Sequence, residues 1–202
     1  MSLKTDISFL GLALVACFAS AFVSGTAGAA QYSTSYNGNS ALHCPSLPPD
    51  QLRIVRQMPV NDPCVGKGTS LYVSSTFRTL FICENGVAVD NYDVSLGKSG
   101  IGKTTKDDNK TPIGTYSLGS PRESEKFGLF IPVGYPTKAQ REQGFTGEAI
   151  GIHGPARQFR CIGFLNVVFD WTAGCMAVAD DGFIMRIARW VDAHPKAKIT
   201  IR

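Results

Sequence analysis

The chain has 202 residues and a formal net charge of +4 at pH 7, and 44% of its residues are hydrophobic. This length suits one folded domain with a leader, and the apolar content is ordinary for a globular protein. The charge is mild and no basic run is present, which excludes a polybasic tail for nucleic acid. The lack of an internal repeat or a low-complexity tract excludes a solenoid.

Residues 1–29 have the pattern of a secretory signal peptide. Lys4 lies in a short leading segment, residues 7–23 are almost wholly apolar, and an Ala-Gly-Ala cleavage site ends at residue 29. A Leu-Val-Ala-Cys sequence ending at Cys17 also resembles a lipoprotein cleavage box. Simple cleavage is the favoured reading, because the apolar run continues past Cys17. With either signal, the protein is expected to leave the cytoplasm.

Residues 30–68 are expected to form an N-terminal extension that is partly flexible. Residues 31–41 are rich in Ser, Tyr, Asn and Gly, a composition typical of a flexible segment. Prolines are frequent after Cys44, and residues 50–58 between them could form a short helix. His43 lies beside Cys44, but this pair lacks the spacing of a zinc site.

From residue 69 to residue 202 the sequence predicts one mainly β domain. Short apolar runs alternate with polar or turn-forming segments, as in a β-sandwich or barrel. Glu84-Asn85-Gly86 is a hairpin turn signal between two of these runs. The expected strands are residues 71–73, 80–82, 87–96, 115–118, 127–133, 148–153 and 197–201.

Two helices and one long loop complete the expected domain. A short helix is expected within residues 137–144, and a longer one after Asp180 or Asp181, which are candidate caps. The longer helix has apolar residues at helical spacing, namely Ile184, Ile187, Ala188 and Val191. Residues 155–169 are expected to be a loop that acts as a lid or as a wall of the substrate groove.

His153 and Cys175 are the candidate catalytic residues. Each adjoins a short apolar run, so two strand ends could bring an imidazole beside a thiol. A nearby imidazole can take the proton of a thiol and make it a nucleophile. Gly174 allows close approach of the backbone to a ligand and leaves an N–H for an oxyanion. Considered singly, a cysteine is more often a small buried apolar residue than a nucleophile. A single histidine is more often a hydrogen-bonded residue of a loop than a catalytic base.

Four motifs occur in order along the chain: YDVSLG at residues 92–97, KTPIGTY at residues 110–116, His153-Gly154, and Thr172-Ala173-Gly174-Cys175. Together they resemble the signatures of the L,D-transpeptidases, the YkuD-type cysteine enzymes of bacterial cell walls. The resemblance implies a β-sandwich with a small helical supplement and one C-terminal helix.

Two positions depart from the pattern of this family. Many members have a histidine where Ala173 stands and an arginine where Ala177 stands. The Asp-Trp-Thr-X-Gly-Cys form that begins at Asp170 resembles a Gram-negative branch that includes both transpeptidases and hydrolases. The resemblance therefore implies the periplasm of a Gram-negative bacterium and leaves the acceptor open.

The resemblance also assigns roles at the site. Cys175 is expected to attack a carbonyl, with His153 as the general base and then the general acid. The carbonyl of Gly154 is expected to orient the imidazole, and the N–H groups of Gly174 and Cys175 to bind the oxyanion. The resting pair is either a neutral thiol with neutral imidazole or an ion pair. No metal or organic cofactor is expected.

Four further residues are candidates for substrate binding. Trp171 and Thr172 precede the nucleophile, Arg157 lies in the long loop, and Lys110 ends a Gly- and Lys-rich loop. A lysine in such a loop is more often solvated than bound to a ligand, and Trp171 could equally pack in the core.

The cysteine count predicts two disulfides and one free thiol in an exported chain. Five cysteines follow the expected signal peptide, and Cys175 must stay reduced if it is the nucleophile. The favoured pairs are Cys44–Cys64, which is local, and Cys83–Cys161, with two other pairings left open.

Three functions compete. The first is transpeptidation of peptidoglycan stem peptides, which would cross-link the wall or attach a protein to it. The second is hydrolysis at the same site, as a carboxypeptidase or an amidase. The third is a non-catalytic wall-binding module, which the presence of both His153 and Cys175 disfavours. The expected partners are stem peptides and a wall-attached protein, with a membrane only if Cys17 is lipidated, and no nucleic acid.

Overall fold

The computed structural model describes residues 61–202. The expected signal peptide, the lipidation site at Cys17 and the short helix at 50–58 lie outside the described residues. In the described part, no helix is long and apolar enough to cross a membrane.

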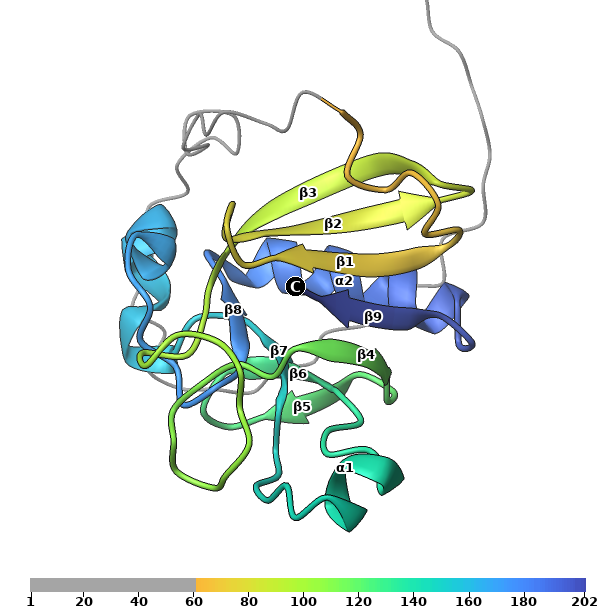
Figure 1. The fold of residues 1–202 in the computed structure, drawn as a ribbon. Helices are drawn as coiled ribbons and strands as arrows, with labels where there is room; N and C mark the ends of the chain where they lie inside the picture. Colours follow the sequence, from red (N-terminus) through yellow and green to blue (C-terminus); the bar gives the residue numbers. More distant parts are fainter. Residues whose placement is uncertain (1–60) are drawn as a thin grey trace, which may run out of the picture. The chain divides into compact units, whose positions relative to one another are not determined.

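Nine strands form one curled sheet, so the expected mainly β class is confirmed (Figure 1). Their order in the sheet is β4-β9-β1-β2-β3-β8-β7-β6-β5. The strands are β1 (Ser70–Ser74), β2 (Thr79–Glu84), β3 (Val87–Ser95), β4 (Gly114–Ser117), β5 (Arg122–Ser124), β6 (Gly128–Pro132), β7 (Gly151–His153), β8 (Met176–Val178) and β9 (Lys198–Ile201).

The predicted hairpin turn joins β2 to β3. Asn85 and Gly86 both have positive φ, at 51° and 83°, which is the requirement of a type I′ turn between antiparallel strands. The two strands pair in antiparallel register from Thr79↔Asp93 to Glu84↔Val87. The short β5 was not predicted, since its three residues are polar and its pairing with β6 supplies the structure.

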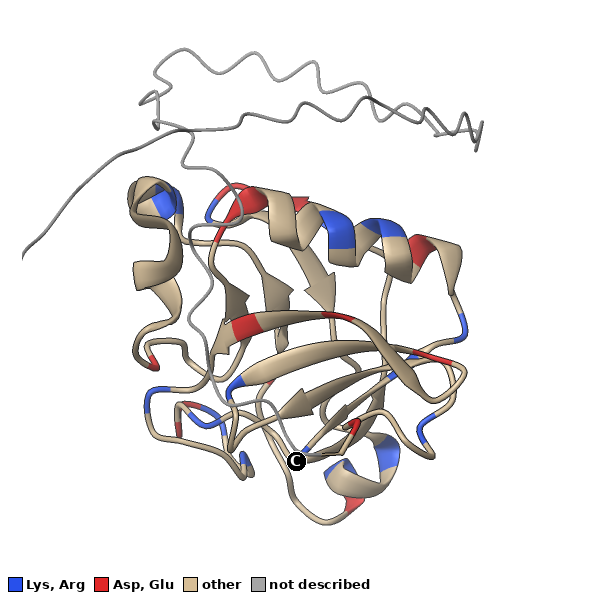
Figure 2. Ribbon diagram, turned by 90° about the horizontal axis from the view of Figure 1, so that it is seen from above, with Lys and Arg blue, Asp and Glu red and all other residues tan. Residues whose placement is uncertain are grey.

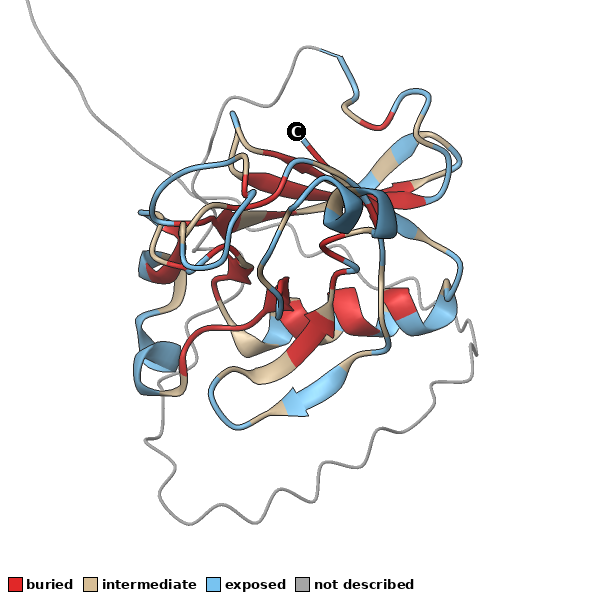
Figure 3. Ribbon diagram, turned by 60° about the horizontal axis from the view of Figure 1, so that its bottom comes forward, coloured by how far each residue is buried: buried red, intermediate tan, exposed pale blue. Residues whose placement is uncertain are grey.

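The C-terminal helix forms as predicted. Helix α2 (Asp181–Ala193) begins after Asp180, whose carboxylate accepts the N–H of Phe183 at 2.9 Å. Its buried face is made of Ile184, Ile187, Ala188 and Val191. This face packs with strand residues of β1, β8 and β9 in one hydrophobic cluster, and buried residues concentrate between α2 and the sheet (Figure 3).

Of the other two segments, the short helix forms as expected, whereas the expected loop is helical. Helix α1 (Lys138–Glu142) begins at a Thr137 capping box, as expected for a short helix in this region. The loop expected at 155–169 is instead largely a 3-10 helix, η1 (Arg157–Val167), with a kink at Gly163. The sequence did not predict this segment, because 3-10 runs longer than three or four residues are uncommon.

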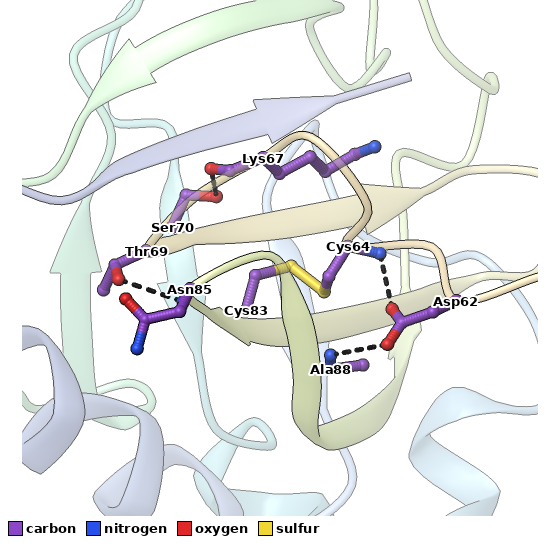
Figure 4. The surroundings of a disulfide bond; sticks show 8 residues. All are labelled: Asp62, Cys64, Lys67, Thr69, Ser70, Cys83, Asn85 and Ala88. Carbon is purple, nitrogen blue, oxygen red and sulfur yellow. Dashed lines mark hydrogen bonds between the residues drawn. A yellow bond between two sulfur atoms is a disulfide. The ribbon is translucent and has the colours of Figure 1, made fainter.

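The disulfide pairing expected from the sequence is wrong. Cys64 bonds to Cys83, with the Cα atoms 5.4 Å apart (Figure 4). Cys83 lies in β2, and the segment that holds Cys64 lies against the β2–β3 hairpin, where the N–H of Gly86 donates to the carbonyl of Gly68. Asp62 fixes the same corner, because its carboxylate accepts the N–H groups of Cys64 and Ala88.

The remaining cysteines lead to a prediction. Cys161 is also disulfide-bonded and Cys175 is free. We expect mass spectrometry of unreduced peptides to show a Cys64–Cys83 link and a link from Cys161. Only Cys175 should be labelled by a thiol reagent before reduction. Labelling of several cysteines without reductant would contradict the pairing.

Candidate active site

Two neighbouring parallel strands carry the candidate base and nucleophile. In the register of β7 and β8, Ile152 faces Met176 and His153 faces Ala177. Cys175, one residue before β8, is therefore level with Gly151. Because side chains alternate along a strand, His153 and Cys175 project from the same face of adjacent strands. The register thus places on one face of the sheet the two residues that the sequence proposed as a pair.

The imidazole of His153 is buried among aromatic rings. It stacks on Phe127 with ring centroids 3.7 Å apart, and Trp171 meets it edge-on at 5.8 Å. Nδ1 lies 2.6 Å from the carbonyl oxygen of Gly154. A carbonyl can only accept, so Nδ1 carries the proton, and the neutral ring presents Nε2 as its basic nitrogen. Gly154 holds the ring as the sequence resemblance implied.

His153 is buried and Cys175 is half-buried, and this loss of solvent disfavours the charged form of both groups. Desolvation lowers the pKa of His153 to about 4, against the opposing effect of the hydrogen bond that the ring donates to the carbonyl of Gly154. Desolvation also raises the pKa of Cys175 to about 11, against the smaller opposing effects of a backbone hydrogen bond and nearby lysines. An ion pair would form only if the imidazole of His153 were a stronger base than the thiolate of Cys175. Of the two expected resting states, the structure therefore favours neutral thiol with neutral imidazole.

The turn before Cys175 needs glycine at residue 174. Gly174 has φ of +126°, a region that side chains rarely adopt. An added Cβ would also lie 2.5 Å from the carbonyl oxygen of Lys110. Lys110 therefore borders the nucleophile through its backbone.

Thr172 organises this turn from inside. Its hydroxyl donates to the carbonyl of Cys175 at 2.8 Å and accepts the N–H of Gly174 at 3.1 Å. Only 3% of the residue is exposed. The side chain expected to bind substrate is thus occupied within the turn. The N–H of Gly174 is engaged as well, which leaves the N–H of Cys175 as the candidate oxyanion donor.

The loop that supports Gly174 is held by a buried ion pair. Lys103 is 4% exposed and contacts Asp108 at 2.7 Å. Asp108 also accepts the N–H groups of Thr104, Thr105 and Lys110. Burial opposes ionisation, but these hydrogen bonds hold the pKa of Asp108 well below its usual range. Lys103 is therefore a structural cation of the loop, while remaining near enough to Cys175 to favour a thiolate.

The other two expected substrate residues flank the site. The Trp171 ring lies beside His153, and its Nε1 donates to the carbonyl of Asn166 in η1 at 2.8 Å. Arg157 begins η1 and lies 3.6 Å from Asp181 at the start of α2. Trp171 and Arg157 thus join η1 to the site and to α2.

Two contributors were missed by sequence reasoning. Phe127 forms the stacking face for His153, but an aromatic residue in an expected strand has no signal beyond packing. Ala149 has φ of 58°, which is uncommon for a residue other than glycine. Its carbonyl accepts the thiol proton of Cys175 at 3.4 Å. The Gly147-Glu148-Ala149 sequence could have indicated a turn at this position, but not its direction.

Comparison with known proteins identifies the family. The sequence model of the L,D-transpeptidase catalytic domain, YkuD, matches residues 69–201. The chain belongs to this family. No curated protein matches it.

Several solved structures are similar to this L,D-transpeptidase domain. The cell shape determining protein Pgp2 of Campylobacter jejuni is 22% identical, with a TM-score of 0.53, over 65% of this chain and 46% of that one. Bd1075 of Bdellovibrio bacteriovorus is 21% identical, with a TM-score of 0.48, over 66% of this chain and 47% of that one. An L,D-transpeptidase of Xylanimonas cellulosilytica is 15% identical, with a TM-score of 0.43, over 70% of this chain and 63% of that one. The chain spans about half the length of the first two.

The raised pKa of Cys175 predicts slow alkylation of the folded domain. With a pKa of about 11 instead of 9.0, the thiolate fraction at pH 7 is about 100-fold lower than for an ordinary thiol. We expect the iodoacetamide rate to rise with pH toward a midpoint near 11, and unfolding in urea without reductant to lower that midpoint. A midpoint below 8 in the folded domain would indicate a thiolate–imidazolium pair instead.

The lowered pKa of His153 predicts acid destabilisation. The folded pKa of about 4 lies below the ordinary 6.5, so the unfolded chain takes up a proton first as pH falls. The free energy of unfolding should therefore decrease between pH 6.5 and 4, by about 3 kcal/mol for this group. Urea unfolding at both pH values would measure it. His153→Gln should remove that decrease and His194→Gln should keep it; an equal decrease in both variants would contradict the assignment.

Proposed function

We propose that the chain is an L,D-transpeptidase that acts on peptidoglycan stem peptides through a Cys175 thioester. The observation that carries the proposal is the pairing of β7 with β8, which sets His153 and Cys175 on one face, with Nε2 of the imidazole basic. Family membership supports the class of substrate.

The first half of the reaction forms the thioester. Sγ of Cys175 attacks the carbonyl carbon of the donor stem while Nε2 of His153 takes the thiol proton. The N–H of Cys175 is proposed to stabilise the oxyanion. As the tetrahedral intermediate collapses, the C–N bond breaks and the imidazolium gives its proton to the leaving amine.

The second half depends on the acceptor. In transpeptidation, an amine of another stem or of a wall-attached protein attacks the thioester, His153 takes its proton, and the Cys175 thiol is released. In hydrolysis, which is the alternative activity, water attacks in the same way. Ala173 and Ala177 stand where the family often has histidine and arginine, which keeps hydrolysis as the second candidate.

The remaining assignments concern the surroundings of the site. Trp171 and Lys110 are proposed to border the bound stem, while Thr172 and Arg157 are proposed to act through the turn and η1 that they hold. Residues 1–29 are proposed to direct the protein to the periplasm, with lipidation of Cys17 as the alternative.

Mass spectrometry of muropeptides incubated with the mature protein tests the proposal. New dimers are expected from transfer, and shortened stems would assign hydrolysis. An unchanged muropeptide profile would support the non-catalytic wall-binding module instead.

A further inference from the structure

A basic groove lies at the end of the sheet that carries β4, β9 and β1. Its volume is about 500 Å³. Four cationic residues line it, Lys67, Lys196, Lys198 and Arg202, together with three threonines and a serine. None of its lining residues is acidic. The function proposed above makes no use of this groove.

The groove is on the face of the sheet turned away from the hydrophobic core. Along β9, Ile199 and Ile201 are buried in the core cluster. Lys198 and Thr200 alternate with them and therefore point outward. On the neighbouring strand β4, Thr115 pairs with Thr200, and their hydroxyl oxygens are 3.0 Å apart. The strand pattern thus sets hydroxyl groups between cationic side chains.

The positive charge of the groove is not neutralised locally. Among residues 61–202, the ion pairs are made by Arg78, Lys103, Arg157 and Arg160, and by none of the four groove cations. Lys67 instead lies over the ring of Tyr72, 4.4 Å from its centroid. By contrast, α2 carries basic and acidic residues together (Figure 2). Within the described residues, the groove therefore has cationic side chains that make no ion pair and no acidic side chain in its lining.

A concave surface with one sign of charge concentrates anions near it. Lysine and arginine donate charge-assisted hydrogen bonds to carboxylate oxygens, and hydroxyl groups add neutral ones. Each exposed pair contributes little by itself. A polymer with repeated carboxylates gains from many weak pairs at once, because each contact raises the effective concentration of the next. The groove chemistry thus suits a polyanionic chain better than a single small anion.

We propose that this groove is a docking site for the carboxylate-bearing peptidoglycan polymer, separate from the site of acyl transfer. The inference rests on the proposed function for the identity of the polymer. Three strands, β1, β2 and β3, separate β9 from β8. The groove residues of β4, β9 and β1 thus lie on other strands than Cys175, which precedes β8. A polymer can bind the groove with one segment while one of its stems reaches Cys175.

Co-sedimentation with purified, insoluble peptidoglycan tests the groove. The test pair is Lys196→Glu with Lys198→Glu, and the control pair is Lys138→Glu with Arg189→Glu, which makes the same change in net charge at exposed positions outside the groove. We expect the groove pair to weaken binding at low salt on the order of tenfold or more. The control pair should bind within about twofold of the parent. High salt should remove this difference.

Two further measurements complete the test. Turnover of small soluble muropeptides should be the same in the groove pair and the parent, and peptidoglycan with amidated carboxyl groups should bind the parent as weakly as untreated polymer binds the groove pair. Parent-like binding by the groove pair, equal losses in both pairs, or full binding of amidated polymer would overturn the docking site. Lack of muropeptide turnover by the parent would instead count against the proposed function. The docking site would still be tested by comparing peptidoglycan binding of the groove pair with that of the control pair.

Discussion

Cys175→Ala is expected to abolish turnover of muropeptides while leaving the domain folded. Without Sγ no thioester can form, so the loss should be on the order of 10⁴-fold or more, the scale seen when a nucleophile is removed. The thiol donates a long hydrogen bond to the carbonyl of Ala149, at 3.4 Å. Its removal should therefore change the free energy of unfolding by no more than about 1 kcal/mol.

Two measurements separate loss of chemistry from loss of fold. Turnover is followed by mass spectrometry, and unfolding by urea titration of the parent, Cys175→Ala and Cys175→Ser. Cys175→Ser keeps a hydroxyl in place of the thiol and serves as the isosteric control, with turnover also expected near background. Substantial activity in the folded alanine variant would end the cysteine-enzyme proposal.

His153→Gln is expected to lower turnover on the order of 100-fold or more, the scale of general acid–base assistance. The thiol of Cys175 has a pKa of about 11, so it depends on Nε2 of His153 to take its proton during attack. Glutamine keeps polar atoms in the buried position but cannot accept that proton. Because the pKa of His153 is about 4, the parent should keep its base in the neutral form down to about that pH.

His194→Gln is the matched control for this variant. His194 ends α2, where its Nδ1 lies 2.8 Å from the carbonyl of Trp190 and its ring stacks on Trp190. Its replacement should leave turnover and its pH profile like those of the parent. If His153→Gln kept the turnover of the parent at neutral pH, the base would have to be another group.

These expectations depend on the surroundings of the pair as much as on the pair. Phe127 and the carbonyl of Gly154 fix the ring and tautomer of His153. Thr172 fixes the turn that presents Cys175. The ion pair of Lys103 with Asp108 holds the loop behind that turn. A change in any of these groups should therefore act through the position of the base or the nucleophile.

The sequence by itself determined most of the elements and the two central residues. Alternating apolar residues predicted the strands, because a half-buried strand repeats every two residues. Asp180 and the helical spacing that begins at Ile184 predicted α2. His153-Gly154 and the Thr-Ala-Gly-Cys turn identified the family, since these local patterns need no knowledge of distant contacts.

Only the tertiary structure decided which distant residues meet. Cys64 pairs with Cys83 because the segment before β1 lies against the β2–β3 hairpin, where the carboxylate of Asp62 accepts the N–H of Ala88. The separation of Cys64 from Cys83 along the chain is 19 residues, close to its separation from Cys44, so chain separation could not choose between the two partners. Thr172 is occupied inside its turn, which composition could not indicate. The resting charge of His153 and Cys175 is set by burial, a property of the packed site and not of the motif. Local periodicity is written in neighbouring residues, but desolvation, register and cross-strand contacts exist only once the sheet has closed around them.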